Sequence, residues 1–115
     1  MRYLCIYKSV EGVPPSQKTI TEMGALIEEM SKKGVLLATE GCLPSATGFK
    51  IRRSGETYAV TDGPFTESKE VIGGFALIDV KSKDDAIAWT KRFLYVAGDG
   101  ESEIRLLCEQ SPMAQ

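Results

Sequence analysis

The sequence predicts an α+β fold of the ferredoxin-like type, a sandwich in which two helices lie on one face of a sheet. Strand-like and helical patterns follow one another in the order strand, helix, strand, hairpin, strand, helix, strand. Two strand-helix-strand units with right-handed crossovers build this sandwich, and the hairpin is an insertion. The length of 115 residues fits one domain. We assign residues 1–110 to that domain and residues 111–115 to a loose polar tail.

The first strand and the first helix are expected before residue 35. Residues 1–8 form an apolar run that is too short for a signal peptide and is typical of a strand. Thr19 and Glu22 match a capping box, and Gly34 is a stop signal after a basic last turn. Between them, apolar residues recur with the spacing of one helix face at Ile20, Met23, Leu26, Ile27 and Met30.

A second strand and a hairpin follow. Residues 35–39 form a continuous apolar run, as in a strand that is covered on at least one face. Residues 49–53 and 57–61 alternate in polarity, and Ser54-Gly55 between them predicts the turn of a β-hairpin.

The last three elements are a strand, a helix and a strand. Residues 75–80 are mostly apolar on both faces, with Asp79 as the exception. Ser82 is the expected cap of a helix with Ala86, Trp89 and Phe93 on one stripe. Residues 103–109 alternate as a final strand, and this alternation predicts one side that carries Ile104, Leu106 and Cys108.

The stretch from Thr61 to Phe75 joins the hairpin to the next strand and is rich in charge, glycine and proline. Pro64 fixes its own φ and holds Gly63 extended, which predicts a rigid corner. Thr66 is the expected cap of a short helical turn through Lys69 and Glu70. We expect Gly73-Gly74 to end this turn as a hinge.

These residues carry a family resemblance that extends over almost the whole chain. The chain resembles the YCII-related, DGPF-type proteins in Asp62-Gly63-Pro64-Phe65, Glu67, Lys69-Glu70 and Gly73-Gly74-Phe75. It also resembles them in Glu40-Gly41, Leu43-Pro44 and Glu103-Ile104-Arg105. The resemblance implies a dimeric α+β barrel and no single known reaction. Some of the wider group are thought to use a His-Asp pair, and this chain has no histidine.

The predicted sheet has one face without a helix. We expect the residues on this face to be Tyr3, Cys5, Tyr7, Phe75 and Leu77, which are too apolar for open water. A second copy of the chain is the simplest cover, so the sequence predicts a homodimer.

Composition excludes several classes of partner. Lysine and arginine, 14 against 16 acidic residues, are scattered, which excludes a nucleic-acid surface. No segment approaches the ~20 apolar residues of a membrane span, so we expect a soluble cytoplasmic protein. Cys5, Cys42 and Cys108 lack the spacing of a zinc or redox site, and Cys42 is the one to test for reactivity. We assign no cofactor and no metal ligands, although paired carboxylates remain an alternative for metal binding.

Without histidine, acid-base chemistry at neutral pH falls to a carboxylate, a lysine or a thiol with a shifted pKa. Asp62 is the candidate catalytic residue; the alternative is a turn former whose carboxylate accepts local backbone amides. Arg105 is a candidate for binding an anionic group; the alternative, for Arg105 and Glu40 alike, is an ion pair that holds strands or subunits together. The other candidate ligand-binding residues are Glu40, Gly63, Pro64, Phe65, Lys69 and Glu70.

Two function classes follow. The first is an enzyme or binding protein with a small-molecule site at the corner and the dimer cleft, because related dimeric barrels include isomerases, lyases and a dehydrochlorinase. The second is a non-catalytic interaction or regulatory protein, which the resemblance suggests through the association of such proteins with extracytoplasmic-function sigma factors.

Overall fold

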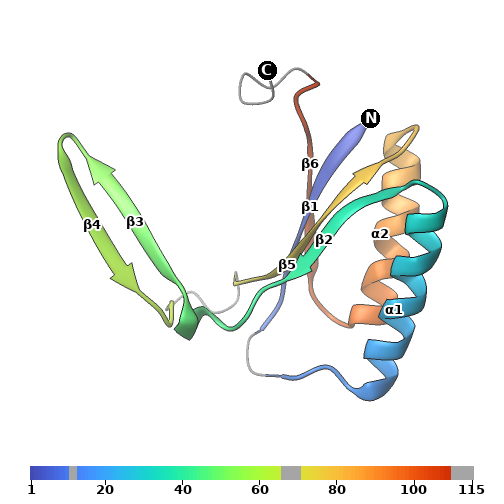
Figure 1. Cartoon of the computed structure of the whole chain (residues 1–115), viewed down its shortest axis with the longest axis horizontal. Coiled ribbons are helices and arrows are strands. Elements are labelled where there is room, and N and C mark those ends of the chain that lie inside the picture. Colours follow the sequence, from blue (N-terminus) through green and yellow to red (C-terminus); the bar gives the residue numbers. More distant parts are fainter. Residues whose placement is uncertain (11–12, 66–70, 110–115) are drawn as a thin grey trace.

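A computed structural model describes residues 1–10, 13–65 and 71–109, and it confirms the ferredoxin-like α+β fold (Figure 1). A four-stranded antiparallel sheet has the order β2-β5-β1-β6. Its strands are β1 (Arg2–Lys8), β2 (Leu36–Gly41), β5 (Ile72–Asp79) and β6 (Glu101–Leu106). Helices α1 (Gln17–Lys32) and α2 (Lys83–Ala97) lie side by side on one face (Figure 1). The strand order is that of two interleaved strand-helix-strand units.

The inserted hairpin forms a separate two-stranded sheet. It consists of β3 (Phe49–Ser54) and β4 (Thr57–Asp62), with Gly55 at φ 61° in the turn. Only glycine adopts this left-handed conformation at little cost, which explains the turn signal in the sequence. A 3-10 turn, Ser45–Thr47, precedes the hairpin. The hairpin projects away from the main sheet on the side opposite the helices (Figure 1), and we refer to residues 49–62 as the arm.

The core lies between the sheet and the helices. Its buried residues are Tyr3, Leu26, Met30, Ile78, Val80 and Ala86. Trp89 and Phe93 of α2 pack against this core, as the helical stripe predicts. Tyr7 also faces the helices, because its ring meets Phe93 edge to face with centroids 5.2 Å apart.

Two helix boundaries follow from local chemistry. The α2 cap is as expected, since Ser82 Oγ accepts a hydrogen bond from the Asp85 amide at 3.1 Å. The expected Thr19 cap is wrong. Ser16 caps α1, because its hydroxyl accepts from the Thr19 amide at 3.1 Å and the helix begins at Gln17. Gly34, at φ 72°, follows α1 as the expected stop signal.

The expectation about the face without helices was wrong for three residues. Tyr3, Cys5 and Tyr7 are paired with Ile78, Ala76 and Gly74, and this side of the sheet faces α1 and α2. Leu4 and Ile6 occupy the other face instead, beside Leu77 and Phe75 as expected. β1 is apolar on both faces, so alternation alone could not decide which set faces the helices.

Two further expectations change, and two others are not tested. Gly73 and Gly74 lie inside β5 rather than at a hinge, since Gly74 pairs with Gly41 and Tyr7. β6 ends at Leu106, so Cys108 is exposed beyond it, and Leu106 is exposed as well. The expected helical turn from Thr66 through Glu70 and the expected tail 111–115 lie outside the described residues.

Candidate functional site

The Asp62-Gly63-Pro64-Phe65 corner joins the base of the arm to the 3-10 turn. The Gly63 amide donates to the Gly48 carbonyl at 2.9 Å, and the Phe65 amide donates to the hydroxyl of buried Ser45 at 3.2 Å. The Gly63–Pro64 peptide bond is cis. These bonds connect the chain after β4 to the chain before β3, so both ends of the arm are fixed at one place.

Gly63 and Phe65 have clear structural roles at this corner. A Cβ on Gly63 would overlap the carbonyl of Ser45, so no larger residue fits without a shift of the backbone. The Phe65 ring lies against Gly48, and the Lys50 ammonium group lies 4.3 Å from the ring centroid. The corner therefore needs glycine and an aromatic ring for its shape, whatever else they do.

Asp62 is the last residue of β4, and its side chain is exposed on the arm. It lies opposite Phe49, so both side chains are on the same face of the hairpin. No hydrogen bond or ion pair to its carboxylate is present within the described ranges. The corner is thus held by Ser45 and Gly48 and not by the local carboxylate-amide bonds that the turn-former interpretation requires.

The sheet face away from the helices, which we call the open face, has an apolar centre between two charged edges. Strand register places four residues in one row across the sheet, in the order Glu40, Phe75, Ile6 and Glu103. The neighbouring row consists of Ala38, Leu77, Leu4 and Arg105. Glu40 on β2 and Arg105 on β6 are therefore at opposite edges, too far apart to pair within one chain.

A cluster of three charged side chains, Lys8, Glu103 and Arg105, lies at the β6 edge of the open face. Lys8 Nζ is 3.0 Å from Glu103 Oε1, and Arg105 Nη1 is 3.2 Å from Glu103 Oε2. A hydrogen bond from Lys8 and a smaller contribution from the hydrogen bond of Arg105 lower the pKa of the Glu103 carboxyl group. Arg105 remains 70% exposed, so its guanidinium group can still donate to an anion. The pairing of Arg105 with Glu103 was not predicted, although residues two positions apart on one strand share a face.

The structure brings some of the candidate residues together. Asp62, Gly63, Pro64 and Phe65 are contiguous at the arm base, and Glu40 is on the strand that leads to it, five residues before Ser45. Arg105 is at the far edge of the sheet. Lys69 and Glu70 lie outside the described residues. Within the described ranges, no group of three or more acidic or cysteine side chains is placed to hold a metal ion, and no helix is long and apolar enough to cross a membrane.

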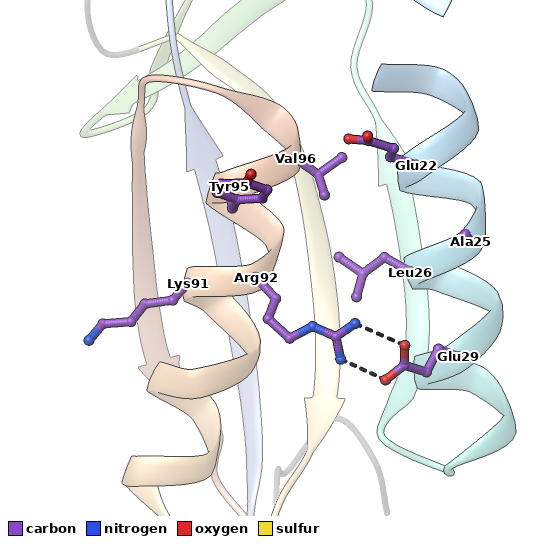
Figure 2. Close-up of a pocket in the computed structure, with 8 residues that line it drawn as sticks. All are labelled: Glu22, Ala25, Leu26, Glu29, Lys91, Arg92, Tyr95 and Val96. Carbon is purple, nitrogen blue, oxygen red and sulfur yellow. Dashed lines mark hydrogen bonds and ion pairs between the residues drawn. The ribbon is translucent and has the colours of Figure 1, made fainter. Parts of the chain in front are cut away.

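A shallow groove lies on the opposite side of the molecule, between α1 and α2 (Figure 2). The Arg92 guanidinium group crosses it and binds both carboxylate oxygens of Glu29, at 2.6 and 2.8 Å. Hydrogen bonding to Arg92, more than any other contact, lowers the pKa of Glu29 to about 2. Arg92 also lies over the Trp89 ring, 4.9 Å from its centroid. The groove is bridged by an ion pair that joins the two helices, which is a structural role.

Three comparisons bear on this geometry. The family model of the YCII-related domain matches residues 1–109. An uncharacterised protein of Rhizobium meliloti (strain 1021) is 28% identical over 97 residues, which cover 84% of this chain and 78% of that protein. A solved structure of 5-chloro-2-hydroxyhydroquinone dehydrochlorinase (TftG) from Burkholderia phenoliruptrix AC1100, in complex with 2,5-dihydroxybenzoquinone, covers 96% of both chains with a TM-score of 0.55 and 15% identity. At that identity the likeness shows the fold alone.

Proposed function

The chain belongs to the YCII-related family, and on this basis we propose that it is a cytoplasmic homodimer that binds or converts a small molecule beside the Asp62–Phe65 corner and the dimer interface. One observation carries the proposal. The Asp62 carboxylate is exposed at a corner whose shape is fixed by other groups, from Ser45, Gly48 and Phe65. A charged group that no described contact uses, held on a rigid segment, is well placed to bind a ligand or accept a proton.

The fold supports the small-molecule class. The dehydrochlorinase with the same fold was solved with a dihydroxybenzoquinone bound, so this architecture can accommodate a compact ring with polar substituents. For the present chain we propose a ligand with hydroxyl or N–H donors toward Asp62. Arg105 would attract an anionic substituent.

The open face supports the dimer. Leu4, Ile6, Phe75 and Leu77 form its centre, and helices cover only the other face (Figure 1). A second copy that covers this surface should bury at least ~2,000 Å² in total, as obligate dimers do. Light scattering at micromolar concentration should therefore give twice the chain mass, and a monomer there would contradict the dimer.

The ligand is tested by a thermal-shift screen of metabolites against the purified protein, with dihydroxybenzoquinones and small hydroxy acids included. A true ligand should raise Tm in proportion to the logarithm of its concentration above Kd. The Asp62→Asn protein is screened in parallel as the site control. If no compound stabilises the wild type more than this variant, the site is wrong and a non-catalytic regulatory role becomes the better hypothesis.

A further inference from the structure

Within the described residues, the strands of the arm have little support from their own chain. Every residue of β3 and β4 is exposed, and one face of the hairpin is mostly apolar. Register puts six side chains on that face: two are charged, Arg53 and Asp62, and four are apolar and each more than 60% exposed, Phe49, Ile51, Tyr58 and Val60. A two-stranded hairpin alone is only marginally stable in water. The apolar face of the arm therefore needs a cover that this chain does not supply within its described residues.

The radius of gyration and the accessible surface of the chain also indicate that a single copy leaves the arm uncovered. Its radius of gyration is 16.0 Å, against about 13 Å for a compact domain of this length. Its accessible surface is 8747 Å² at a mass of 12.6 kDa, and a globular monomer of that mass exposes about 6,200 Å². The four apolar arm side chains expose roughly 400 Å². Covered on two copies, this is about half of the ~1,600 Å² of a standard interface.

The arm also lies where a second copy would be. It projects on the side of the sheet opposite the helices (Figure 1), and a second copy on the open face occupies that same side. Two sheets that pack face to face are about 10 Å apart. An arm that extends from the sheet on this side must then lie along the second copy.

The charged residues at the two edges of the open face favour one orientation of the two sheets. A two-fold axis parallel to the strands places the β2 edge of one copy over the β6 edge of the other, at both ends of one isologous contact. By register Glu40 would then lie over Glu103 of the second copy, in the cluster whose two cations, Lys8 and Arg105, outnumber that one carboxylate. Within the described ranges the exposed Glu40 carboxylate makes no ion pair, and Arg105 has donors beyond its one bond to Glu103. The opposite orientation places Glu40 over Glu40, which is repulsive.

We propose that the arm of each chain packs its apolar face on a second copy of the chain, so that each ligand site contains residues of both chains. Asp62, on the apolar face of the arm, and Glu40 come from one copy. Arg105 comes from the other. This inference rests on the proposed dimer and deepens the proposed site, because it states that a single chain holds only part of it.

The arm contact is tested by paired substitutions of directly opposed residues. Ile51→Ser with Val60→Ser removes the middle of the apolar face, and Arg52→Ser with Ala59→Ser makes the matched change on the other face. Analytical ultracentrifugation should show the dimer Kd rising by at least ~100-fold for the first pair and by less than ~3-fold for the second. Hydrogen exchange at residues 49–62 should slow as protein concentration rises through Kd. Equal Kd values for the two pairs would overturn the arm contact.

The orientation is tested by exchanging charges between chains. Glu40→Lys and Arg105→Glu should each weaken the homodimer, because each gives residue 40 the same sign of charge as the net charge of the opposite cluster of Lys8, Glu103 and residue 105. A mixture of the two variants should form a heterodimer with Kd near that of the wild type, since both contacts are again opposite in charge. Native mass spectrometry measures the fraction of heterodimer in the mixture directly. As a control, Glu56→Lys mixed with Arg105→Glu should give no such rescue. A wild-type dimer with no rescue overturns the inference but leaves the proposed dimer, whereas a monomeric wild type overturns both.

Discussion

Gly63 lies so close to the carbonyl oxygen of Ser45 that a Cβ at position 63 would overlap it. The same glycine donates its amide to Gly48, so the corner cannot move away from the 3-10 turn without losing a hydrogen bond. The family signature in this chain is therefore partly explained by shape. Gly63 and Phe65 close the base of the arm, and among the corner residues Asp62–Phe65 it is Asp62 that the described contacts leave for chemistry.

The first prediction concerns this close contact. Gly63→Ala should destabilise the protein by about 2 kcal/mol, because the methyl group forces the backbone apart at a packed site. Gly24→Ala is the matched control: a Cβ at this position in α1 meets nothing within 4 Å, and alanine favours the helix by about 1 kcal/mol. Urea denaturation of both variants measures the difference. Equal stabilities would mean that the corner is looser than its contacts indicate.

Much of the fold could be predicted from the sequence because its signals are local. The helix stripes, the Ser82 cap and the Gly55 turn each depend on a few neighbouring residues. The errors about the sheet came from long-range packing, whereas the Thr19 cap was a local error of three residues. β1 is apolar on both faces, so which face is buried depends on where the helices lie. Position 74, inside β5, is glycine because its backbone lies too close to the Glu40 carbonyl for a side chain to fit.

The candidate site was predictable only in part, for the same reason. The corner residues are adjacent in sequence, so their proximity was expected. By contrast, the position of Arg105 at the edge opposite Glu40 follows from strand order, and its bond to Glu103 follows from side-chain conformation. Nothing in the sequence signalled that Glu29 and Arg92, 63 residues apart, would form a bidentate pair.

The second prediction uses that pair. Because the pKa of Glu29 is lowered to about 2 from its ordinary 4.5, the ionised form stabilises the folded chain. This contribution is complete above pH ~4.5 and is lost as pH falls from there toward 2. Glu29→Gln should therefore be less stable than the wild type at pH 7, and the difference should vanish near pH 2. Thermal unfolding across this range provides the measurement.

Glu28→Gln is the control for this pH series. Among the described residues the Glu28 carboxylate pairs with the exposed Lys32 one turn away, at 2.9 Å, and such surface pairs contribute little to stability. The stability of the Glu28→Gln protein should follow that of the wild type at every pH of the series. If Glu28→Gln and Glu29→Gln behaved alike, the bidentate contact between the helices would have no special role.

The third prediction separates the cysteines. Cys42 and Cys108 are exposed, whereas Cys5 is partly buried and burial raises the pKa of its thiol. Thiolate is the reactive form, so in the folded protein Cys5 should react with a thiol reagent at least ~10-fold more slowly than the two exposed cysteines. We expect two fast equivalents and a third that becomes fast in denaturant. Three fast equivalents under native conditions would contradict the packing of Cys5 beneath the helices.

The last prediction tests the charge of Asp62. The described contacts that hold the corner come from Ser45, Gly48 and Phe65, so Asp62→Asn should change the stability by no more than about 0.5 kcal/mol. Asparagine keeps the size and removes the negative charge. If the carboxylate binds the ligand or accepts its proton, affinity or activity should fall by at least ~100-fold. Calorimetric titration with a compound from the thermal-shift screen, at protein concentrations well above the dimer Kd, measures this without interference from dissociation. Glu56→Gln, which removes an exposed charge at the far end of the arm, should leave affinity unchanged. Equal affinities of the wild type and a folded Asp62→Asn protein would assign Asp62 no role in the site, and the search would move to Glu40 and Arg105.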